Sequence, residues 1–136
     1  MTVDGESMAM VVDLMAGDPV VVAPDLPVDV VAGVLAAYDV GGLPVVDATG
    51  RLVGVVSQTD LVRLRATSVQ ASDWPTLLVR DVMTQPAITI RGSASLREAA
   101  RVMTEHDIHR LVVVGDDAKT ALGVISDSDL VRAFAG

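Results

Sequence analysis

The sequence predicts a mixed α/β (α+β) fold made of two tandem β-α-β-β-α repeats. The segment GVVSQTDLVR at residues 54–63 returns as GVISDSDLVR at residues 123–132, with seven of ten positions identical. Apolar residues make up 51% of the chain and are mostly Val, Ala, Leu and Met, whereas aromatic residues make up only 2%. Because β-branched residues favour strands, this composition predicts sheets rather than an all-helical bundle.

The duplication extends well upstream of this segment. DLMAGDPVVV at 13–22 corresponds to DVMTQPAITI at 81–90, and DVGGLPVVD at 39–47 corresponds to DIHRLVVVG at 107–115. We therefore divide the chain into three parts: a first repeat at 8–66, a connector at 67–76 and a second repeat at 77–135. A unit of about 60 residues buries too little apolar surface to be secure alone. We thus expect the two repeats to pack sheet to sheet around a pseudo-twofold axis.

Each repeat predicts a strand, a helix, a strand pair and a final helix, in that order. In the first repeat these are a strand at 19–22, a helix at 27–38, strands at 43–47 and 52–57, and a helix that opens with DLVR at 60–63. In the second they are a strand at 87–90, a helix at 96–106, strands at 111–115 and 121–126, and a helix that opens with DLVR at 129–132. Pro27 suits a first helical turn, and Ser95 with Glu98 predicts a capping box.

The net charge and the hydropathy argue against a nucleic-acid-binding protein and against a membrane protein. The net charge of −8 argues against a nucleic-acid surface, which needs clustered Lys and Arg. Nine acids and three bases lie in residues 1–68, against nine acids and seven bases in 69–136, so a small anionic ligand should prefer the second half. Apolar runs are too short to span a bilayer, and no secretory signal or cysteine is present. We expect a cytoplasmic protein without a membrane partner.

The repeated Ser-x-x-Asp motif has two interpretations, which the sequence leaves open. Ser57 with Asp60, and Ser126 with Asp129, match the start of a helix, where the serine accepts a backbone N–H and the acid faces the positive end of the helix dipole. The same groups also suit a sugar, because a carboxylate offers two acceptor oxygens and a ribose presents two neighbouring hydroxyl donors.

Taken together, the DLM and DVM segments, the LPVVD to GRLVGVVS hairpin and the doubled Ser-x-x-Asp resemble a CBS-domain pair, or Bateman module. The resemblance covers about residues 11–134. It implies a regulatory module that binds adenosine-containing ligands, such as AMP, ATP or S-adenosylmethionine, in clefts between its two repeats. It also implies a homodimer that acts through a separate effector protein, with no required cofactor.

The resemblance assigns roles to particular residues. It implies that Asp60 and Asp129 hold ribose, with Ser57 and Ser126 beside them. It also places adenine against the strand residues Val20, Val21, Leu43, Pro44, Ala87, Ile88, Leu111 and Val112, although such residues are more commonly core. Where the first repeat has glycines at 41 and 42, the second has His109 and Arg110, which could bind phosphate. We therefore predict that the second site tolerates phosphate.

The residues also bear on two other function classes, an enzyme and a pure interaction module. An enzyme is not expected, because no strained Gly-x-Ser-x-Gly turn is present. A metal site is not expected either, since His106 and His109 straddle the end of a predicted helix and no further ligands are evident. The remaining alternative is a dimerisation or protein-interaction module that binds no nucleotide and uses the apolar segments MAMVVDLM and LLVRDVM.

Overall fold

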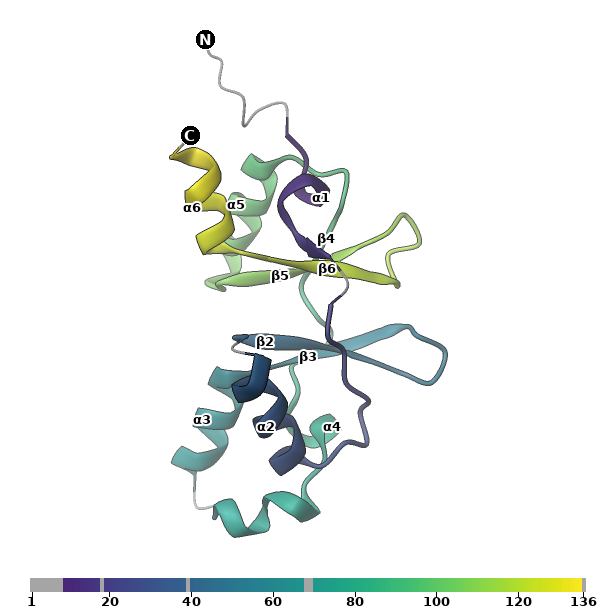
Figure 1. The fold of residues 1–136 in the computed structure, drawn as a ribbon, viewed down its shortest axis with the longest axis vertical. Coiled ribbons are helices and arrows are strands. Elements are labelled where there is room, and N and C mark those ends of the chain that lie inside the picture. Colours follow the sequence, from purple (N-terminus) through teal and green to yellow (C-terminus); the bar gives the residue numbers. More distant parts are fainter. Residues whose placement is uncertain (1–8, 18, 39, 68–69, 136) are drawn as a thin grey trace. The chain divides into compact units, whose positions relative to one another are not determined.

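The chain forms two compact units, and their boundaries are not those of the two sequence repeats. The computed structural model describes residues 9–17, 19–38, 40–67 and 70–135. Val20–Ala87 form one unit, here called the internal unit, and Met1–Pro19 with Ile88–Gly136 form the other, here called the terminal unit. Both units mix helices with strands, which confirms the predicted α+β class (Figure 1).

The internal unit is built on a two-stranded antiparallel sheet. Its elements are α2 (Val28–Tyr38), β2 (Gly42–Val46), β3 (Leu52–Ser57), α3 (Gln58–Ala66), the 3₁₀ helix η2 (Ala71–Thr76) and α4 (Val79–Val82). The strand expected at 19–22 is reduced to Val22, which forms one parallel bridge with Val45 of β2. The segment does not continue as a strand beyond Val22, because a turn begins at Pro24, which has no N–H to donate to a ladder.

The terminal unit is built on a four-stranded sheet. Its elements are α1 (Val11–Leu14), β1 (Ala16–Gly17), β4 (Thr89–Arg91), α5 (Leu96–His106), β5 (Arg110–Val114), β6 (Ala121–Ser126) and α6 (Asp127–Phe134). The strand order is β1-β6-β5-β4, in which only the β4 and β5 pair is parallel. The hairpins β2–β3 and β5–β6 therefore lie where the repeat pattern predicts them.

The leading segment of each repeat packs on the body of the other repeat. In the terminal unit, Val11 N donates to Ala94 O at 2.9 Å. In the internal unit, Val79 N donates to Leu26 O at 2.9 Å. The two contacts are equivalent by the repeat, so the exchange is reciprocal. It explains why the compact units and the sequence repeats divide the chain differently.

Gly54 allows the second leading segment to approach β3 closely. Thr84 N donates to Val55 O at 2.8 Å, and Val55 N donates to Thr84 O at 3.0 Å. A Cβ at position 54 would lie 2.8 Å from the carbonyl oxygen of Thr84 and 2.9 Å from Sδ of Met83, too near for any side chain. The absence of a side chain at Gly54 thus allows Thr84 to pair with Val55 of β3.

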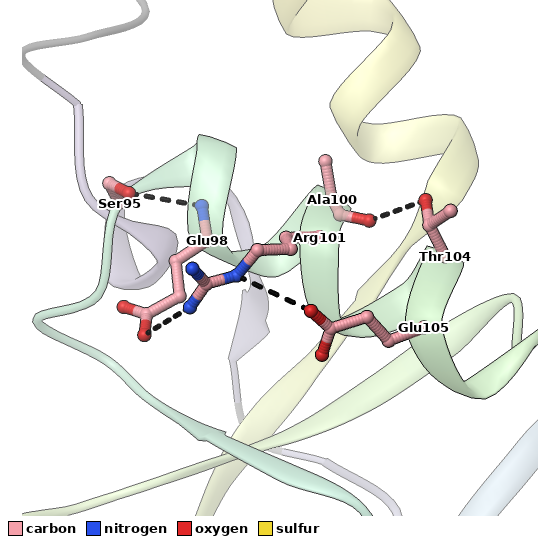
Figure 2. A network of polar contacts seen from close by, with 6 residues as sticks. All are labelled: Ser95, Glu98, Ala100, Arg101, Thr104 and Glu105. Carbon is pink, nitrogen blue, oxygen red and sulfur yellow. Dashed lines mark hydrogen bonds and ion pairs between the residues drawn. The ribbon is translucent and has the colours of Figure 1, made fainter.

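Helix α5 begins with a serine cap and carries a charged surface (Figure 2). Ser95 Oγ accepts from Glu98 N at 3.1 Å, but the Glu98 carboxylate pairs with Arg101 at 3.6 Å instead of returning to Ser95. Only half of the expected capping box therefore forms. Arg101 also lies 3.8 Å from Glu105. Such exposed pairs contribute little to stability, typically below about 1 kcal/mol.

Each unit has its own apolar core. The aliphatic side chains that fill the internal core, all 8% exposed or less, are Val22, Val28, Val31, Leu35, Leu43, Val45, Val56, Leu61 and Val79. Those of the terminal core, all 6% exposed or less, are Val11, Ile90, Leu96, Ala99, Met103, Leu111, Val113, Ile125 and Leu130. In the connector, Trp74 of η2 packs against the internal core.

Candidate functional site

The first Ser-x-x-Asp motif forms the junction between β3 and α3. Ser57 has extended backbone (φ −126°, ψ 164°), and its Oγ accepts from Asp60 N at 3.1 Å. In return, Oδ2 of Asp60 accepts from Ser57 N at 2.8 Å and from Ser57 Oγ at 3.0 Å. These reciprocal bonds make a complete capping box, so the helix-cap interpretation of this motif is correct.

The second motif forms the same junction between β6 and α6. Ser126 Oγ accepts from Asp129 N at 3.2 Å, and Oδ2 of Asp129 accepts from Ser126 N at 2.8 Å. The backbone of Ser126 is again extended (φ −112°, ψ 165°). Both motifs therefore place one hydroxyl and one part-buried carboxylate at the N-terminus of a helix.

The two carboxylates differ in what holds their second oxygen. Oδ1 of Asp60 accepts from the hydroxyl of Thr84 at 3.3 Å. Oδ1 of Asp129 instead accepts from Nη2 of Arg132, three residues further along α6. Arg63, which corresponds to Arg132 in the first repeat, makes no ion pair within the described part of the chain. The first carboxylate therefore has a neutral second partner and the other has a cation.

The structure brings the two basic candidates of the second repeat to the start of α6. Arg110 lies directly opposite Ser126 in the β5–β6 register, which puts their Cβ atoms about 4.5–5.5 Å apart on one face of the sheet. His109 Nδ1 lies 3.0 Å from Oδ2 of Asp127, the first residue of α6. In the internal unit Gly42 lies opposite Ser57, so that junction has no such cation.

The residues expected to contact adenine divide into two groups. The side chains of Leu43, Leu111 and Val112 are 1–3% exposed, Leu43 and Leu111 belong to the two cores, and Pro44 is also buried. The others are more accessible: Val21 is 41% exposed, and Val20, Ala87 and Ile88 are half-buried. Of the four buried residues, only backbone atoms can contact a ligand.

Sequence reasoning missed two residues that contact the carboxylates of these motifs, Arg132 and Thr84, and a third, Asp127, that contacts His109. The Arg132 contact was detectable, because an acid and a base three residues apart on a helix are neighbours. Asp127 and Thr84 carried no local signal. Thr84 is distant from Asp60 in sequence and reaches it only through the exchange of leading segments.

Two broader properties concern the described residues alone. None of their helices is long and apolar enough to cross a membrane. No group of three or more His, Cys, Asp or Glu side chains among them is arranged to hold a metal ion.

Comparison with known proteins identifies the fold. The family model of the CBS domain matches residues 11–67 and, a second time, residues 79–136. The chain belongs to the CBS domain family. The chloroplastic CBS domain-containing protein CBSX2 of Arabidopsis thaliana is 34% identical over 137 residues, which cover 83% of this chain and 57% of that protein. Inosine-5'-monophosphate dehydrogenase of Methanocaldococcus jannaschii is 30% identical over 120 residues, 88% of this chain but 22% of the enzyme.

Solved structures of CBS domain pairs share this architecture. The crystal structure of CBSX2 in complex with AMP has a TM-score of 0.80 and 36% identity, and it covers 93% of this chain and 96% of that one. A CBS domain pair in complex with 5′-methylthioadenosine and S-adenosyl-L-methionine has a TM-score of 0.84 at 24% identity, covering 94% of this chain and 97% of that one. The second likeness concerns the fold alone. The chain thus spans nearly all of each solved domain pair, but only 57% and 22% of the two relatives described above.

Proposed function

We propose that this chain is a regulatory module that binds an adenosine-containing ligand at its Ser-x-x-Asp junctions and performs no catalysis itself. The observation that carries the proposal is the doubled junction in a chain that shares 36% identity with CBSX2, a protein crystallised with AMP. The same class of ligand includes ATP and S-adenosylmethionine. No further cofactor is required in this proposal.

The junction residues match the parts of such a ligand. Asp60 and Asp129 would each accept hydrogen bonds from ribose hydroxyls, and Ser57 and Ser126 would each present a hydroxyl beside them. The adenine edge would form hydrogen bonds with backbone amides and carbonyls near the buried Leu43, Pro44, Leu111 and Val112. The half-buried Val20, Ala87 and Ile88, with the exposed Val21, would supply apolar contact.

The second junction is proposed to be the one that accepts phosphate. Arg110 lies opposite Ser126 and makes no ion pair within the described residues, so its guanidinium is available for bidentate contact with phosphate oxygens. The neighbouring His109 has its Nδ1 3.0 Å from Oδ2 of Asp127, the first residue of α6. We expect Arg110→Ala to weaken AMP binding while leaving adenosine binding nearly unchanged, because adenosine carries no phosphate.

Isothermal titration with AMP, ATP and S-adenosylmethionine tests the proposal. We expect saturable micromolar binding of at least one ligand and a loss of about tenfold or more in Asp129→Asn, because an amide has a single acceptor oxygen. Asp116→Asn, an exposed hairpin acid in the same unit, is the matched control for the lost charge. Absence of binding up to millimolar concentration would leave the junctions as helix caps alone.

Exposed side chains support a second candidate, a homodimer or protein-interaction module. Val62 of α3 and Val131 of α6 occupy equivalent positions in the repeat and are 67% and 63% exposed, and Phe134 is 45% exposed. We propose that these helices contact a second copy of the chain. Sedimentation velocity should show a dimer that dissociates in Val131→Lys, whereas an unchanged dimer would exclude α6 from the interface.

A further inference from the structure

The two junction carboxylates leave different acceptor positions for a ligand. A carboxylate has about four lone-pair positions on its two oxygens. Asp60 accepts three hydrogen bonds inside the internal unit: from Ser57 N at 2.8 Å, Ser57 Oγ at 3.0 Å and Thr84 Oγ1 at 3.3 Å. Asp129 accepts two inside the terminal unit, from Ser126 N at 2.8 Å and from Arg132. Asp129 is therefore the less occupied acceptor.

The way the donors are distributed over the two carboxylate oxygens matters as much as the number of donors. Asp129 receives one donor on each oxygen, so each keeps one position for one hydroxyl of a ribose diol. On Asp60, both Ser57 donors bind Oδ2, and the Thr84 hydroxyl binds Oδ1. The diol therefore finds only one open position on Asp60 unless Thr84 is displaced.

Thr84 contacts Asp60, and it has no equivalent hydroxyl in the other repeat. Thr84 pairs with Val55, and the equivalent pairing in the terminal unit joins Val124 to residue 16, which is alanine and has no hydroxyl. We infer that Thr84 is a specificity-determining residue, whose hydroxyl competes with ribose for Asp60 and makes the first junction the weaker of the two. This inference rests on the proposed function.

The test isolates the first junction and then removes the hydroxyl. Asp129→Asn weakens the second site, and in that background we compare Thr84 with Thr84→Val, which keeps the β-branched shape suited to an extended backbone. Isothermal titration with adenosine should show about threefold to tenfold tighter binding in the valine variant, the factor expected for one competing hydrogen bond. Thr84→Ser, which retains the hydroxyl, should bind as the threonine protein does.

A second ligand makes the test specific for the diol. 2′-Deoxyadenosine has one ribose hydroxyl fewer at this position and needs only one acceptor, so Thr84→Val should change its affinity much less than that of adenosine. Thr49→Val is the matched control, because Thr49 also donates its hydroxyl to an aspartate of the internal unit, Asp47, at 2.6 Å. It should leave the affinity for adenosine unchanged.

The outcomes separate this inference from the function on which it rests. Equal adenosine affinities with threonine and valine at position 84, or no detectable site in the valine variant, would overturn the role of Thr84. The proposed function would still stand in that case if Asp60→Asn protein binds adenosine through the second junction. Absence of adenosine binding by the wild-type chain would overturn both the role of Thr84 and the proposed function.

Discussion

The two Ser-x-x-Asp junctions have nearly the same backbone but different neighbours. Ser57 and Ser126 share extended backbone angles, and both boxes close with a bond of 2.8 Å from the serine N–H to the carboxylate. The second oxygen is held by Thr84 from a leading segment in one unit and by Arg132 from the same helix in the other. The duplication thus repeated the helix cap, whereas residues outside the cap give the two carboxylates different hydrogen-bond partners.

The largest expected effect comes from breaking the contact that places Thr84. In Gly54→Ala the new Cβ would lie 2.8 Å from the backbone oxygen of Thr84, so the leading segment must move. We expect a loss of about 2–3 kcal/mol in the free energy of unfolding, measured by urea denaturation. Gly92→Ala is the comparison in the terminal unit, because its Cβ would meet a side chain, Cβ of Val12, at 3.2 Å and should cost less. Equal costs would contradict a special role for the Gly54 contact.

The next effect compares the two caps directly. Ser57→Ala and Ser126→Ala should each lower the free energy of unfolding by about 1 kcal/mol, because both remove a capping bond. The loss should be larger for Ser57, whose Oγ also donates to Asp60 at 3.0 Å. Thermal denaturation of the two variants measures the difference. A larger loss for Ser126 would show that the hydroxyl of Ser57 adds nothing.

A smaller effect compares the two hairpin turns, which require left-handed backbone at one residue. Gly50 has φ 85° in the β2–β3 turn, whereas Ala118 has φ 60° in the β5–β6 turn. Ala118→Gly should therefore raise the free energy of unfolding by about 0.5–1 kcal/mol, and Gly50→Ala should lower it by about 1 kcal/mol. Opposite signs in urea denaturation confirm the comparison, and a destabilised Ala118→Gly protein would contradict it.

The fold was predictable where a local pattern decided it. Hairpins, the two long helices and both junctions follow from periodicity and from the repeat itself, since each depends on neighbours close in sequence. The exchange of leading segments was not predictable, because it requires the contact of Val11 with Ala94, which are far apart in sequence. The strand expected at 19–22 was predicted too long for a similar reason. A β-branched run forms a strand only where another strand lies beside it, and here only Val22 pairs, with Val45.

The candidate site was predictable to the same extent. The sequence identified Ser57, Asp60 and their counterparts because a cap and a sugar-binding carboxylate need the same residue types. The sequence also singled out Arg110 as a phosphate ligand, but its place opposite Ser126 is known only from the β5–β6 register. It could not identify Thr84, since the approach of that hydroxyl to Asp60 depends on tertiary packing around Gly54.

The smallest expected effect concerns the acids of the two turns. Hydrogen bonds from the Thr120 hydroxyl, and then from the backbone N–H groups of Lys119 and Thr120, lower the pKa of Asp117 from 3.8 to about 2. The pKa of Asp47 is also lowered, first by the Thr49 hydroxyl. A carboxyl whose pKa is lowered in the folded state stabilises the fold above its unfolded pKa of about 3.9, and this contribution is lost as the pH falls toward 2.

We therefore expect the Cγ resonance of Asp117 in NMR to titrate near pH 2, and Thr120→Val to move its pKa back toward the ordinary value. Thr49→Val should do the same for Asp47 and leave Asp117 unchanged, because each turn supplies its own donors. The Thr120→Val protein should also lose less stability than the wild type between pH 4 and about 2, since less of its carboxylate stabilisation remains to be titrated. An unchanged titration of Asp117 in that variant would show that the backbone N–H groups alone set its pKa.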